Sequence, residues 1–168
     1  MFSFFKRKQK PLEPTSEVTA PDTTISYDAD LIDDLKEDHK TLLMHYMQVE
    51  KSARAQNFSE VRAELNHFKT LFHQHILLEN VKLYVYLTHC LESNSEQYKV
   101  VKKMRTDMRH IGKAVNQFID HYDVWPWDEG METQFLGELE QIGSALAARI
   151  KTEEEDLYPL YDIPRETA

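Results

Sequence analysis

The 168-residue chain has few of the residues that interrupt or cross-link a fold: one cysteine, four glycines and six prolines. The lone Cys90 excludes an internal disulfide framework and fits a reducing compartment. The scarcity of glycine and proline leaves long uninterrupted tracts, which favour helices. No apolar run approaches the roughly 18 to 20 residues that span a bilayer, and the first residues do not resemble a secretory signal. We therefore expect a cytoplasmic protein of bacterial type.

Positive charge is also scarce, because 20 Lys and Arg residues stand against 29 Asp and Glu residues, for a formal net charge of −9. Nucleic-acid binding needs a basic face that contacts phosphates, so this balance argues against a nucleic-acid partner. It leaves room for a protein partner with a basic surface. The sequence contains no phosphate loop, cofactor fingerprint or Ser or Cys nucleophile pattern.

The organisation of the chain predicts an all-α, up-down-up-down four-helix bundle over residues 26–162. Residues 1–25 combine prolines with Thr, Ser and Glu, which predicts a disordered tail. A chain of this length with 41% hydrophobic residues is expected to form one domain with a sizeable core. Four tracts with apolar residues in steps of three and four predict helices from Asp28 or Asp30 to about Ala55, from Ser59 to about Cys90, from about Glu96 to Tyr122, and after Gly130 up to Pro159.

Ionisable side chains occupy positions on the apolar stripes of all four predicted helices. They are, in chain order, His39, His75, Glu79, His110, Arg149 and Glu153. Imidazole nitrogens and carboxylate oxygens suit iron, manganese or zinc, and helix bundles commonly build metal sites from facing helices. A single histidine on an apolar stripe is more often a hydrogen-bonded core residue. Convergence of His and Glu residues from four helices favours a metal site instead.

This arrangement resembles the hemerythrin family, in its bacterial HHE cation-binding form, over roughly residues 28–161. The residues that carry the resemblance are Asp38-His39, the H-x-x-x-E of His75 and Glu79, Arg109-His110, and the run from Ile150 to Pro159, which is similar to the family's E-E-x-x-L-[FY]-P signature. The resemblance implies a four-helix bundle with a non-haem di-iron site. It also implies reversible binding of dioxygen, or sensing of oxygen, nitric oxide or iron.

The resemblance further implies a role for each matching residue. His39 and His75 would bind one iron, Glu79 and Glu153 would bridge, and His110 would bind the second iron. The sequence departs from the family pattern at two positions, since Arg149 and Ala114 stand where histidines are expected. One half of the site is therefore complete and the other is largely absent. Because the second metal is poorly supplied, an enzyme such as an oxidase ranks third among the hypotheses, and we expect no enzyme.

Arg149 suggests how the negative charge of the buried glutamates is neutralised in an incomplete metal site. A guanidinium stays protonated and cannot act as a ligand. Four-residue spacing on a helix places Arg149 beside Glu153, so we expect its guanidinium to bond Glu153 or Glu79 in the core. Arg149 would then stand where the second cation would be.

A second resemblance keeps an alternative open. The segment Ile142 to Arg149, followed by its acidic turn, is similar to the bacterial anti-sigma regulators of the Rsd/AlgQ type. That resemblance implies a metal-free four-helix bundle that binds a sigma factor. The leading hypothesis is a hemerythrin-like metal-binding module for sensing or regulation, and the alternative is this metal-free interaction protein.

Overall fold

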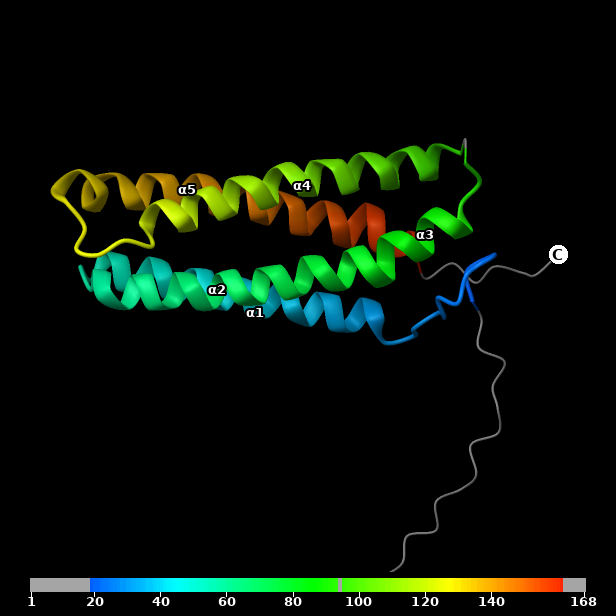
Figure 1. Cartoon of the computed structure of the whole chain (residues 1–168), viewed down its shortest axis with the longest axis horizontal. Coiled ribbons are helices and arrows are strands. Elements are labelled where there is room, and N and C mark those ends of the chain that lie inside the picture. The colour runs from blue at the N-terminus through cyan, green and yellow to red at the C-terminus, as the bar shows by residue number, and fades with distance from the viewer. Residues whose placement is uncertain (1–18, 94, 162–168) are drawn as a thin grey trace, which may run out of the picture.

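The computed structural model describes residues 19–93 and 95–161 and forms an antiparallel bundle of four helical rods (Figure 1). It therefore confirms the predicted all-α fold. The rods are built from α1 (Leu31–Arg54), α2 (Phe58–Leu78) continuing into α3 (Val85–Cys90), α4 (Glu96–Tyr122) and α5 (Glu129–Thr152). Two π-helical turns complete them: Glu79–Tyr84 joins α2 to α3, and Glu153–Leu157 continues α5 into the 3-10 turn Tyr158–Leu160.

Local sequence signals explain where the later helices begin. The Ser95 side chain accepts a hydrogen bond from the Tyr98 amide at 3.2 Å, and the Asp128 side chain accepts one from the Met131 amide at 2.8 Å. Both are N-caps, which satisfy amides that have no partner within the helix. The α2 helix begins one residue before the predicted cap, because Asn57 and not Ser59 holds the N-cap position.

The expected tail ends earlier than residue 25. Residues 1–18 of that tail lie outside the described residues, but Thr19 pairs with Ser26 in an isolated β-bridge. The Ala20 amide donates to the Ile25 carbonyl at 2.8 Å, and Ala20 is fully buried against the bundle. The predicted boundary is therefore wrong for residues 19–25, because a small apolar side chain fits this end of the core. The boundary at 162 also lies outside the described residues.

The core consists of two apolar clusters with a polar layer between them. One cluster includes Leu42, Phe72 and Leu146, and the other lies toward the chain termini and includes Leu35 and Leu157. Five of the six buried polar or charged side chains in the described residues lie between the two clusters: His39, His75, Glu79, Arg149 and Glu153. The sixth, Ser52, lies near the end of α1 beside one of the clusters. Within the described residues no helix is long and apolar enough to cross a membrane.

Candidate metal centre

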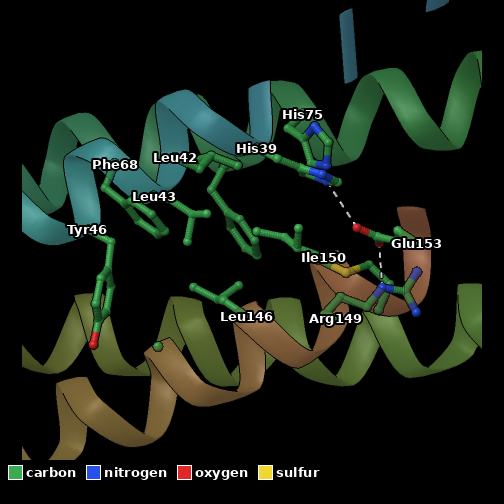
Figure 2. Close-up of a pocket in the computed structure, with 13 residues that line it drawn as sticks. His39, Leu42, Leu43, Tyr46, Phe68, His75, Leu146, Arg149, Ile150 and Glu153 are labelled. Atoms are coloured by element: carbon green, nitrogen blue, oxygen red, sulfur yellow. Dashed lines mark hydrogen bonds and ion pairs between the residues drawn. The ribbon is translucent and has the colours of Figure 1, made fainter. Parts of the chain in front are cut away.

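The polar layer brings together three of the predicted ligands (Figure 2). His39 comes from α1, His75 from α2, and Glu153 is the first residue after α5. One nitrogen or oxygen from each lies within 4.8 Å of the others, and all three side chains are buried. Two imidazoles and a carboxylate at this separation can share one metal ion.

Both histidines are oriented by outer carboxylates. Asp38 Oδ2 lies 3.3 Å from His75 Nδ1, and Glu154 Oε1 lies 2.8 Å from His39 Nδ1. The Nε2 atoms therefore face the polar layer, where His39 Nε2 is 3.1 Å from Glu153 Oε2. Metal-binding histidines typically hold their other nitrogen in this way. No role for Glu154 was predicted from the sequence, and its side chain is 38% exposed.

Each carboxylate of the layer begins a π-helical turn, and a buried tyrosine lies five residues later. Glu79 precedes Tyr84, and Glu153 precedes Tyr158. In a regular α-helix, residues five apart point about 140° away from each other. The wider π turn lets both members of each pair face the core, and such turns often occur at functional sites.

The two tyrosines connect the π turns to each other. Tyr158 Oη donates to Glu79 Oε1 at 3.1 Å and lies 3.1 Å from His39 Nε2. Tyr84 Oη accepts from Arg149 at 2.5 Å. The sequence interpretation missed both tyrosines. Tyr158 lies inside the E-E-x-x-L-[FY]-P run and could have been found there, whereas nothing local marks Tyr84.

Arg149 lies in the layer as predicted. Its side chain is only 5% exposed, and its Nε donates to Glu153 Oε1. Its other nitrogens donate to the Met104 carbonyl at 3.1 Å and to Tyr84 Oη. Each nitrogen of this buried cation therefore has an acceptor, one of them charged, so Arg149 is an integral part of the core.

His110 does not join this group. It is exposed on α4, as is His121. The buried stripe of α4 includes Met104 and Met108, and a residue two positions after Met108 points about 200° around the helix. The expected place of His110 on the stripe is therefore wrong, and within residues 96–122 no side chain of α4 offers a buried His, Asp or Glu ligand.

Contacts within the layer shift the pKa of each ionisable group. Burial alone would lower the pKa of His39, but hydrogen bonds with Glu153 and Glu154 raise it above its ordinary value. Burial alone would raise the pKa of Glu153, but His39 and Arg149 lower it. Burial and the charge of Glu153 raise the pKa of Glu79 well above normal, and burial lowers the pKa of His75. The layer thus favours an ion pair at His39 and Glu153, with Glu79 and His75 neutral.

Glu79 provides a direct test of whether a cation fits. Its side chain is fully buried, and its Oε2 atom has no hydrogen-bond partner among the described residues. Its Oε1 atom lies 4.0 Å from His75 Nε2. A buried carboxylate oxygen without a partner is costly, and a metal ion on the same side as the histidines would satisfy it. The donor set therefore fits one ion.

One comparison with known proteins identifies a family whose model spans the polar layer. The family model described as hemerythrin HHE cation binding domain matches residues 30–161, which contain every residue of the polar layer. No curated protein and no solved structure gives a significant match.

Proposed function

Because this chain belongs to the hemerythrin HHE cation-binding family, we propose that it binds one metal ion, iron first, in the polar layer. His39, His75 and Glu153 would supply the ligand atoms that already lie within 4.8 Å of one another, and Glu79 would turn its unpartnered oxygen to the same ion. The observation that carries this proposal is the pair of inward-facing Nε2 atoms, each held by an outer carboxylate. Manganese and zinc suit the same donors.

We propose that the site holds one ion and not two. Arg149 bonds Glu153 Oε1, whereas His39 contacts the other oxygen, Oε2. A second ion would lie on the Oε1 side and would need a further ligand from α4 or α5. Its permanent positive charge neutralises the carboxylate that a second ion would share. The di-iron arrangement of the family is incomplete here for this reason.

The surroundings of the layer support a sensing or regulatory role. A cavity of about 20 Å³ adjoins His39, His75 and Glu153 and is lined mainly by apolar side chains (Figure 2). This volume suffices for one molecule of about the size of water. Iron, when bound, would supply coordination positions for dioxygen or nitric oxide. We propose binding of such a small molecule without enzymatic turnover, in the cytoplasm.

Metal analysis tests the proposal. The protein, purified without chelator and loaded with iron under anaerobic conditions, is expected to carry about one ion per chain. His75→Ala should reduce this to a small fraction, because it removes a buried ligand. His110→Ala is the matched control and should leave the metal content unchanged, because His110 is exposed. Iron, manganese and zinc all far below one per chain in the parent protein would refute a metal centre.

Metal affinity is expected to rise with pH. The raised pKa of His39 and of Glu79 means that a proton competes with the metal at each group. Raising the pH removes these protons, so the dissociation constant for Mn²⁺ should fall by roughly tenfold per pH unit for each proton displaced. Calorimetric titration between about pH 6 and pH 8, in buffers of different ionisation enthalpy, measures both the affinity and the protons released. A pH-independent affinity without proton release would contradict this assignment.

One observation favours a second candidate, a metal-free interaction bundle similar to the anti-sigma regulators. Arg149 and His39 already provide Glu153 with two cationic partners, so most of the layer is balanced without a metal. In that case a sigma factor should bind the purified protein equally well with chelator present and after His75→Ala. Loss of binding in either condition would exclude this candidate.

A further inference from the structure

A second feature of the molecule lies outside the metal centre. A groove of about 960 Å³ runs between α4 and the rod formed by α2 and α3, which face each other across the front of the bundle in Figure 1. Met108 and Ile76 contribute apolar side chains to it. At Gly112, where α4 has no side chain, an added Cβ would lie 3.6 Å from Ile76. The buried or half-buried Met108, Gly112 and Ile76 thus form an apolar floor, and exposed polar side chains form the walls.

The walls carry four cations, although the chain as a whole is acidic. Lys102, Arg105, Arg109 and Lys113 line the groove and are exposed. Among the described residues, Asp120 at one end of the groove is the only acidic residue in its lining, and it already pairs with Lys69 at 2.5 Å. The groove is thus a basic surface on a chain with a net charge of −9.

These four cations have no carboxylate partner within the part of the chain that the structure describes. Of the fifteen Lys and Arg residues in the described ranges, eight form an ion pair with Asp or Glu. Four of the other seven are those of the groove. Arg105 bonds the Asn80 side chain at 3.2 Å and lies over the Tyr84 ring, and Lys102 lies over the Tyr98 ring, so these contacts hold the cations in place without neutralising them.

The spacing of the cations indicates what shape of anion they suit. They follow one another on α4 in steps of three, four and four residues, so they form one row of about 16 Å along the helix. An adjacent helix with carboxylates at the same spacing would place an acid opposite each of them. Apolar residues on the same face of that helix would contact Met108 and Ile76.

We propose that this groove binds an acidic amphipathic helix of a partner protein. Carboxylates of that helix pair with Lys102, Arg109 and Lys113, and its apolar side chains pack on the floor. A nucleic acid is a poorer fit, because the net charge of −9 repels a long polyanion and the floor offers apolar contact. The composition alone led us to expect an acidic binding surface, whereas the surface of this groove is positively charged.

Fluorescence anisotropy with a defined probe tests the proposal. The probe is a labelled helical peptide of about 18 residues with four glutamates at the three-four-four spacing, leucines beside them and alanines elsewhere. The full-length parent protein should bind it, and affinity should fall as salt is raised from about 50 to 300 mM, because the contacts are screened. Replacing Lys102, Arg109 and Lys113 together by Gln should weaken binding roughly tenfold or more.

The matched control replaces three cations that also have no carboxylate partner among residues 19–93 and 95–161 but lie outside the groove. Lys36→Gln, Lys51→Gln and Lys151→Gln together change the net charge by the same amount and should alter affinity by less than about twofold. Equal weakening by both triple variants would overturn the proposal, since it would show a response to net charge only.

Two further probes distinguish a helical partner from an unstructured acidic chain and from a nucleic acid. A peptide of the same composition with glutamates spread around all faces should bind at least about fivefold more weakly, because it cannot match the row. Binding of both peptides with equal affinity would overturn the proposal. Tighter binding of a thymidine oligonucleotide of about 15 bases than of the helical peptide would make the groove a nucleic-acid site and overturn it as well.

Amide chemical shifts of the unmodified protein locate the bound peptide. On adding the helical peptide, shift changes should fall within residues 73–88 and 98–120, which contain the groove lining. Changes confined to other regions would place the peptide elsewhere and overturn the proposal.

Discussion

Replacing Arg149 with methionine is expected to lower the free energy of unfolding of the metal-free protein by about 3 to 5 kcal/mol. The substitution keeps most of the side-chain volume but removes the cation that bonds Glu153, the Met104 carbonyl and Tyr84. Glu153 is only 2% exposed, so its charge would be left with His39 as its ionic partner among the described residues. Urea denaturation of the chelator-treated protein, followed by far-ultraviolet circular dichroism, measures the change.

Arg54→Met provides a matched control. Arg54 also bonds a glutamate four residues away, Glu50, but this pair lies on the surface of α1. Exposed pairs of this spacing contribute little, so the stability should remain nearly unchanged. Similar losses for both variants would show that burial does not govern the Arg149 contact and would contradict its role as an internal cation.

Arg149→His is expected to act differently from Arg149→Met. It removes the fixed cation and adds a neutral nitrogen ligand beside Glu153. Metal content should rise from about one ion toward two per chain, and the lost stability should return only when metal is present, because the ion binds the folded state. Metal analysis together with unfolding curves with and without iron measures both effects. An unchanged metal content would contradict this prediction and would show that the α4 side of the layer offers too few ligands for a second ion.

The helices could be predicted from the sequence because their buried stripes are regular. On α2, for example, the buried residues follow one another in steps of three and four: Leu65, Phe68, Phe72 and His75. A regular α-helix turns such positions into one buried face. The same regularity predicted the contact between Arg149 and Glu153, because the π turn begins only at Glu153 and the residues before it keep the α-helical period. The stripes of α1, α2 and α5 were predicted correctly because the backbone keeps the α-helical period there.

The sequence interpretation failed where that period changes or where a stripe was extended too far. Tyr84 reaches Arg149 only because the π turn brings a residue five positions after Glu79 back to the core. No residue type marks such a turn in advance, so neither tyrosine contact was predicted. His110 was assigned to the buried stripe of α4, but the angular position two residues after Met108 places it on the exposed side instead.

The second large effect is expected at Glu153, where replacement by glutamine should weaken metal binding by more than roughly a hundredfold. The amide keeps the shape of the side chain but removes the charge that faces His39 Nε2 and Arg149. The metal-free protein should also lose about 3 to 5 kcal/mol, because a buried arginine loses its charged partner. Titration with Mn²⁺ and urea denaturation measure the two losses on the same variant.

The neighbouring glutamates form a graded control within the same turn. Glu154 holds His39 Nδ1 from a half-exposed position, so Glu154→Gln should weaken metal binding by roughly ten- to a hundredfold through the orientation of the imidazole. Glu155 is exposed, and Glu155→Gln should change neither affinity nor stability measurably. The order of loss should therefore be Glu153, then Glu154, then Glu155. Equal losses at all three would mean that the acidic run attracts cations by charge alone. In a specific metal site the three carboxylates have different roles, because Glu153 binds the ion, Glu154 orients a ligand and Glu155 faces solvent.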